Sequence, residues 1–252
     1  MNQDISICVL TENEMGWTEP FELDKVQILD NYYLSAQKSD IAFLKKMDTA
    51  RLLAGFRTTA GIDTKGVRPY GGWEDSLLGG HCVGHYLTAL AQAVKVTGDK
   101  ELKEKSQTLI AGLEECQKKL GTGFLFGAKV EDKEDVEKQF DILEGKKKGE
   151  TWVPWYNMHK VLAGLVDTYK YTGNETALLV AEKLGDWIYE RVSKWDLKMN
   201  QKVLETEYGG MNDCLYELYS YSHNKHHLEA AQKFDEKALF LMAAKGEKNC
   251  LD

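Results

Sequence analysis

Histidine, aromatic and carboxyl side chains gather in three short stretches of the sequence. The stretches are PYGGWEDSLLGGH (69–81), TWVPWYNMH (151–159) and TEYGGMND (206–213). Pairs of carboxyl groups can act as acid and base on a glycosidic bond, and aromatic rings form the walls of ligand pockets. We therefore expect the three stretches to form one pocket.

The first stretch ends at His81, and a second histidine, His85, follows it closely. His81 and His85 lie four residues apart, a spacing that allows two histidines of one helix to chelate a metal. Cys82 replaces the glutamate of the metalloprotease motif HExxH, and no third ligand follows at local spacing. We therefore interpret His81 and His85 as pocket-lining or structural residues and predict no metal site.

The second stretch contains four aromatic or histidine residues within eight positions. Trp152 precedes Pro154, so we expect it to pack against the core. Trp155, Tyr156 and His159 lie at the start of an expected helix, and we predict that they line the pocket.

The third stretch supplies the best candidates for an acid or base. Glu207 and Asp213 flank a Gly-Gly pair, and Asn212 lies beside them. The chain has no GxSxG element, P-loop or GxGxxG motif, which argues against a serine hydrolase or a nucleotide-binding site of those types.

The elements that would position these residues are pairs of helices. Three segments each show two amphipathic helical patterns separated by a short break. The breaks are Thr-Gly-Asp (97–99), Thr-Gly-Asn (172–174) and Ser-His-Asn (222–224). Glycine is a common helix terminator, and Asp or Asn can cap the next helix. The sequence therefore predicts an all-α fold of αα-hairpins.

The spacing of the breaks is uneven, unlike that of a short-period solenoid, and favours an α/α toroid. In a toroid the first helix of each hairpin lies in the inner ring, so the three stretches would meet at one end of that ring. Residues 127–150 are rich in charge, and we expect a solvated surface excursion there.

Composition excludes several function classes. The chain has 252 residues, 43% of them hydrophobic, and a net charge of −8. We therefore expect a sizeable core, no nucleic-acid partner and, without a long apolar run, no membrane span. The five cysteines form no CxxC pair and no signal peptide is visible, so we expect reduced thiols and a cytoplasmic location.

Several motifs together resemble the beta-L-arabinofuranosidases of glycoside hydrolase families 127 and 146. They are PFELDKVQI, RLLAGFRTTAGI, YGGWE, GHCVGHYLTALA, WVPWYNMHKVLAGLVDTYKYTGN and EYGGMND. The resemblance implies an (α/α)6 toroid followed by β-sandwich domains. It also implies release of L-arabinofuranose from plant glycans with retention of configuration, by a zinc-bound cysteine nucleophile and a glutamate acid/base.

The resemblance implies a substrate-lining role for the matching positions. They are His81 and His85 (GHxxGHY), Trp155, Tyr156 and His159 (WYxxHK), and Glu207, Gly209, Gly210 and Asn212 (E[FY]GGMN). Asp213 stands where the family usually has glutamate, which shortens the carboxyl side chain by one methylene.

The resemblance places the zinc ligands and the nucleophile in a later part of the toroid, and this chain has no ExC or Cys-Cys pair to match them. We therefore expect an N-terminal extension (1–19), the N-terminal part of a catalytic domain (20–252), an incomplete ring, and no catalytic residue or cofactor in this chain. Zinc is expected in the complete enzyme, with an L-arabinofuranose-containing glycan as its partner.

Two other interpretations stay open at this point. One is another α/α-toroid carbohydrate enzyme, such as an unsaturated glucuronyl hydrolase or a polysaccharide lyase. The other is a non-catalytic helical-repeat binding protein, although aromatic residues confined to the helix starts argue against it.

Overall fold

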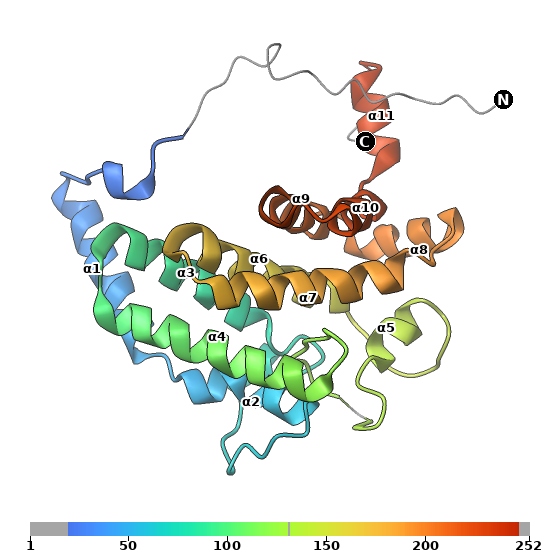
Figure 1. The fold of residues 1–252 in the computed structure, drawn as a ribbon, viewed down its shortest axis with the longest axis horizontal. Coiled ribbons are helices and arrows are strands. Elements are labelled where there is room, and N and C mark those ends of the chain that lie inside the picture. Colours follow the sequence, from blue (N-terminus) through green and yellow to red (C-terminus); the bar gives the residue numbers. More distant parts are fainter. Residues whose placement is uncertain (1–19, 131, 247–252) are drawn as a thin grey trace.

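The structure is a computed structural model that describes residues 20–130 and 132–246, and the regular elements of these residues are all helical (Figure 1). The predicted extension, 1–19, lies outside the described residues. The α-helices are α1 (Asn31–Lys46), α2 (Thr49–Thr59), α3 (His81–Thr97), α4 (Lys100–Leu120), α5 (Lys138–Leu143), α6 (Pro154–Thr172), α7 (Glu175–Val192), α8 (Leu197–Glu207), α9 (Met211–Ser222), α10 (Lys225–Lys233) and α11 (Lys237–Ala244). Two short 3₁₀ helices are η1 (Leu23–Lys25) and η2 (Gly72–Asp75).

The three predicted hairpins are confirmed as α3–α4, α6–α7 and α9–α10. Each first helix ends at a residue with a left-handed backbone: Gly98 (φ 66°), Gly173 (φ 67°) and His223 (φ 52°). Each second helix is capped by a side-chain oxygen that accepts a backbone N–H: those of Asp99, Asn174 and Asn224. The local chemistry of each break therefore reverses the chain within three residues.

The hairpins form two layers. Helix α3 packs on α6 and α6 on α9, whereas α4 packs on α7 and α7 on α10. First helices therefore neighbour first helices, and second helices neighbour second helices, which is the layered arrangement of an α/α toroid. The all-α prediction is confirmed, and Figure 1 shows α11 projecting away from the other helices.

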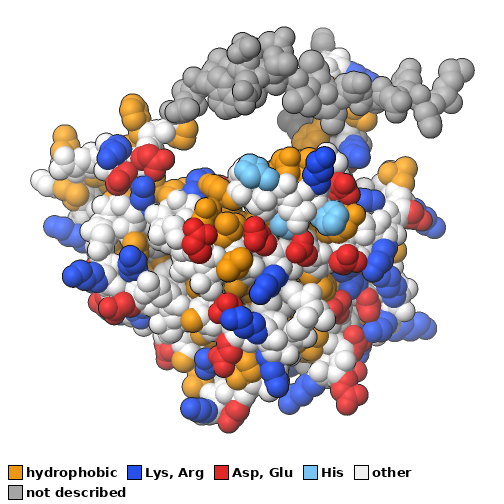
Figure 2. All heavy atoms as spheres, in the orientation of Figure 1, with side chains coloured by type: hydrophobic (Ala, Val, Ile, Leu, Met, Phe, Trp, Pro, Cys, Tyr) orange, Lys and Arg blue, Asp and Glu red, His pale blue; other side chains and the backbone are white. Residues whose placement is uncertain are grey.

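The outer surface carries charges of both signs. Figure 2 shows acidic and basic side chains interspersed on the face that includes α4 and α7. Among the helices of the described residues, none has the length and apolarity needed to cross a lipid bilayer.

The prediction of a solvated excursion at 127–150 is only partly correct: residues 132–134 and 145–150 are exposed, but the middle of the segment is anchored. Helix α5 lies within this segment, and its Phe140 is fully buried against Phe124 and Trp155. Three carboxylates of the segment are held by Arg191, which donates to Glu137 (3.0 Å), Asp141 (2.5 Å) and Glu144 (2.6 Å). A charge-rich segment is thus tied to the core because its carboxylates share one guanidinium group.

Helices α3 and α6 touch backbone to backbone. A Cβ atom on Gly84 would lie 1.9 Å from the backbone oxygen of Lys160, and one on Gly164 would lie 2.5 Å from the oxygen of Gly84. Only glycine fits these two positions, since real side chains never approach a backbone atom so closely. This contact holds the N-terminal halves of the two helices side by side.

We expect Gly84→Ala to destabilise the chain by at least about 2 kcal/mol, because the added methyl group must push α3 away from α6. Urea unfolding followed by circular dichroism measures the change. Gly71→Ala is the matched control: Gly71 has an ordinary φ of −70° and open space around its Cβ position, so we expect a change within about 0.5 kcal/mol. Equal stability of the two variants would contradict the close packing.

Candidate active site

The three chemistry-bearing stretches meet at one pocket of about 380 Å³. Its lining comes from η2 and the turn after it, from the segment that enters α6, and from the end of α8. The lining residues are Trp73, Leu78, Trp152, Val153, Tyr156, Thr206, Glu207, Tyr208 and Gly209. The expectation that these stretches gather at the starts of the first helices is therefore confirmed.

A second hollow, of about 430 Å³, lies between α4 and the α6–α7 turn. Its lining residues include no aromatic or histidine side chain: Lys103, Ser106, Gln107, Ile110, Ala111, Glu114, Thr172, Gly173, Asn174 and Thr176. The aromatic pocket is the better candidate for a specific ligand site because it combines apolar walls with a few polar groups.

Glu207 is the buried acidic group of the pocket. Helix α6 has no capping side chain at its own N-cap, Val153. Glu207 arrives from the end of α8, and its Oε2 accepts the backbone N–H of Tyr156 at 2.9 Å. The other oxygen, Oε1, is buried and has no hydrogen-bond partner within the described part of the chain. A buried oxygen of this kind is suited to a ligand hydroxyl group, since leaving it unpaired is costly.

Burial keeps two polar groups near the pocket, Glu207 and His159, uncharged. It raises the pKa of Glu207 to about 8, although the N–H groups of Tyr156 and Trp155 oppose the shift. It also lowers the pKa of His159 to about 4, assisted by the charge of Lys160. At neutral pH the carboxyl group of Glu207 is therefore mostly protonated and the imidazole of His159 is neutral.

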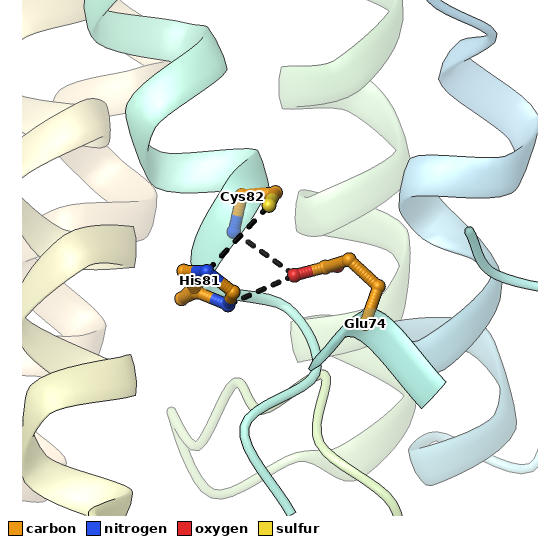
Figure 3. A group of neighbouring side chains, drawn as sticks. All are labelled: Glu74, His81 and Cys82. Atoms are coloured by element: carbon orange, nitrogen blue, oxygen red, sulfur yellow. Dashed lines mark hydrogen bonds and ion pairs between the residues drawn. The ribbon is translucent and has the colours of Figure 1, made fainter. Parts of the chain in front are cut away.

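The start of α3 is organised by another carboxyl group, that of Glu74 in η2 (Figure 3). The N-cap residue, Gly80, has no side chain to cap the helix. Glu74 instead accepts the backbone N–H groups of Gly80 (3.0 Å) and Cys82 (3.2 Å), and its Oε1 lies 2.9 Å from His81 Nδ1. One buried carboxylate thereby caps the helix and fixes the imidazole ring.

Glu74, His81 and Cys82 also form a group with metal-ligating side chains, their ligand atoms lying within 4.8 Å of one another. It is the one such group of three or more among residues 20–130 and 132–246. Carboxylate, imidazole and thiolate are all zinc donors, so the set fits the metal implied by the sequence resemblance. The sequence analysis did not join Glu74 to the other two residues, because a turn separates them, and its expectation of no metal site stays a prediction.

The aromatic assignments in the second stretch are partly wrong. Tyr156 lines the pocket as predicted. Trp155, predicted to line it too, is 0% exposed and packs against Phe140 and Trp195 in the core. Trp152, expected in the core, is 48% exposed and lines the pocket. Trp155 is in phase with the buried stripe of α6, whereas Trp152 precedes the helix.

The histidine pair at the start of α3, His81 and His85, lies beside the pocket. The buried ring of His81 is 6.2 Å from that of Tyr156 and 6.3 Å from that of Trp73, between centroids. The exposed His85 ring is 6.0 Å from that of His81. Their predicted role as substrate ligands stays a proposal.

Three other predicted residues are not among the pocket lining. His159 packs against the backbone of Gly210, where an added Cβ would lie 2.3 Å from the imidazole ring. Asn212 donates from Nδ2 to Asp235 Oδ1 at 3.3 Å, and Asp213 is exposed. These residues border the start of α9 without entering the pocket described here.

Sequence reasoning did not select Trp73, Thr206 or Tyr208 as pocket residues. Trp73 belongs to YGGWE, and the other two flank Glu207, so all three lie inside the stretches already singled out. Each lies shortly before the start of a first helix, and that position could have identified it as a pocket residue.

We expect Glu207 to make stability fall as pH rises. The folded chain keeps a proton on Glu207 up to pH about 8, whereas an ordinary glutamate in the unfolded chain loses it near 4.5. Between these values the folded state binds more protons, so the native chain loses up to about 1.4 kcal/mol per pH unit through this group.

Denaturation of the native chain and of Glu207→Gln at several pH values checks this. The variant cannot ionise here, so its stability should fall less steeply over that range. Glu205→Gln, an exposed change on the same helix, should follow the native curve. Parallel curves for all three proteins would contradict the buried neutral carboxyl group.

Comparisons with known proteins agree with this geometry. A family model described as the beta-L-arabinofuranosidase GH127 catalytic domain matches residues 25–250. A comparison with curated proteins finds no match.

Two solved structures share the fold. One is Ara127N-Se, a GH127 beta-L-arabinofuranosidase from Geobacillus stearothermophilus T6, with 16% identity and a TM-score of 0.59 over 88% of this chain. The other is the GH127 beta-arabinofuranosidase BT3674, with 17% identity and a TM-score of 0.58 over 88% of this chain. The matches cover 35% and 34% of those chains, so this chain spans about a third of their length.

The family match extends over nearly the whole chain and includes all three stretches that form the pocket. It favours this family over the other carbohydrate enzymes and the scaffold protein that the sequence left open. The chain belongs to the GH127 beta-L-arabinofuranosidase catalytic-domain family.

Proposed function

We propose that this chain forms a sugar-binding wall of a glycoside hydrolase site and that its ligand is a terminal β-L-arabinofuranoside. The observation that carries the proposal is the unpartnered, buried Oε1 of Glu207 in a pocket walled by Trp152 and Tyr156. Aromatic faces contact the C–H groups of a sugar ring, and the carboxyl group pairs with one of its hydroxyl groups.

The protonation state of Glu207 supports a ligand with hydroxyl groups. Its carboxyl group is mostly protonated at neutral pH and so presents no charge to the ligand. A protonated Glu207 both donates and accepts hydrogen bonds, which matches a hydroxyl group. The identity of the sugar as arabinofuranose rests on the family.

In this proposal, two of the predicted residues shape the pocket and hold its other groups in place. Tyr156 contributes its ring and, through its N–H, holds Glu207 in place. His81, at the start of α3, places its ring 6.2 Å from that of Tyr156, between centroids. The closely packed helices α3 and α6 keep these groups at a fixed separation.

We expect the 252-residue chain to bind methyl β-L-arabinofuranoside at one site. Trp152→Ala should weaken binding about 5–10-fold, the effect of losing one aromatic contact of about 1–1.4 kcal/mol. Titration calorimetry measures both proteins. Tyr32→Ala removes an exposed aromatic ring on α1 instead and should bind like the native chain.

Methyl L-arabinopyranoside is the matched control ligand, since it has the same atoms in a six-membered ring. Equal affinity for the two sugars would overturn the proposed ligand. Native-like binding by Trp152→Ala would overturn the proposed pocket.

We expect no release of arabinose from 4-nitrophenyl β-L-arabinofuranoside by this chain, with or without added zinc. A retaining reaction requires a nucleophile besides an acid, and the residues lining the pocket include no cysteine. A chromogenic assay at high protein concentration tests this. Zinc-dependent turnover by the purified chain would show that it carries a complete catalytic site.

A further inference from the structure

The start of α3 carries two potential metal ligands on adjacent residues. His81 Nε2 lies 3.6 Å from Cys82 Sγ, a contact drawn as a dashed line in Figure 3, so the two ligand atoms converge. Neighbouring residues of a helix usually point in different directions, so this convergence depends on the fixed position of the His81 ring.

The separation of the two atoms matches a chelate. A tetrahedral zinc ion with a Zn–N distance of about 2.0–2.1 Å and a Zn–S distance of about 2.3 Å holds nitrogen and sulfur about 3.6 Å apart. The two side chains therefore need little rearrangement to share one ion. Cys82 is only half-buried, so an ion can reach its sulfur atom.

Glu74 supplies the partner that a metal-binding histidine needs. Its Oε1 lies 2.9 Å from His81 Nδ1, the ring nitrogen on the opposite side from Cys82. Histidine ligands of metals commonly donate their second ring N–H to a carboxylate, which fixes the tautomer and strengthens the ligand. The arrangement leaves Nε2 as the nitrogen that faces an ion.

We propose that His81 Nε2 and Cys82 Sγ bind a zinc-like divalent ion at the start of α3, with Glu74 as the positioning carboxylate. Water completes the coordination. Imidazole and thiolate select zinc or cobalt over magnesium or calcium. This site is made of residues other than those to which the family resemblance assigns zinc, and it does not depend on sugar binding.

Cobalt is the probe, because a thiolate ligand gives Co²⁺ a strong charge-transfer absorption in the near ultraviolet. The test uses the full chain with Cys8→Ser and Cys250→Ser, since these two cysteines lie outside the described residues. We expect this parent protein to show the absorption at one equivalent of Co²⁺. Zinc should remove it by displacement, and magnesium should not.

Three variants of that parent test the ligands. Cys82→Ser should abolish the absorption. His81→Asn keeps a donor near the Nδ1 position but removes Nε2, and should weaken cobalt binding at least tenfold. Glu74→Gln should weaken it about 10–100-fold, the usual effect of losing such a carboxylate. Cys116→Ala, at a buried position of α4, is the control and should bind like the parent.

A second readout needs no substitution at the site. We expect zinc to protect Cys82 of the native chain from alkylation by iodoacetamide, as measured by peptide mass spectrometry. The buried Cys116 and Cys214 provide internal references. Circular dichroism checks that each variant keeps its helical content.

The proposal is overturned if the parent protein shows no thiolate–cobalt absorption, or if the absorption survives in a folded Cys82→Ser variant. It is also overturned if zinc leaves Cys82 alkylation unchanged, since the pair would then be only a thiol–imidazole contact. Loss of sugar binding with retained cobalt binding would contradict the proposed function alone.

Discussion

The backbone contact between α3 and α6 is the constraint on which the candidate site depends. Gly84 and Gly164 let the two helices approach until their backbones touch, which aligns their N-terminal ends. That alignment places the His81 ring beside Tyr156 and brings η2 next to the segment before α6. A side chain at either glycine would separate the two walls of the pocket.

Two buried carboxyl groups cap the helices that form the site, and neither belongs to the helix that it caps. Glu74 caps α3, and Glu207 caps α6 across 51 positions of sequence. Each carboxyl group also provides a reactive feature besides capping a helix. Glu74 fixes an imidazole ring beside a thiol at α3, and Glu207 has an unpartnered oxygen at α6. The same interactions that start the helices therefore build the polar part of the site.

Local signals in the sequence were sufficient for the hairpins. In two of the three breaks a glycine followed by Asp or Asn specifies a helix end and the next cap, and in the third His223 takes the place of the glycine, so no distant partner is needed. Trp155 was misassigned although it continues the apolar stripe of α6 through Met158 and Leu162. The capping by Glu74 and Glu207, and the carboxylates gathered by Arg191, were beyond prediction because they depend on tertiary contacts.

The structure of the chain with methyl β-L-arabinofuranoside bound tests the central claim most directly. We predict that the sugar ring contacts Trp152 and Tyr156 and that one of its hydroxyl groups lies within hydrogen-bond distance of Glu207 Oε1. A sugar bound elsewhere, or a Glu207 Oε1 that pairs with a protein donor and leaves the sugar uncontacted, would contradict the account.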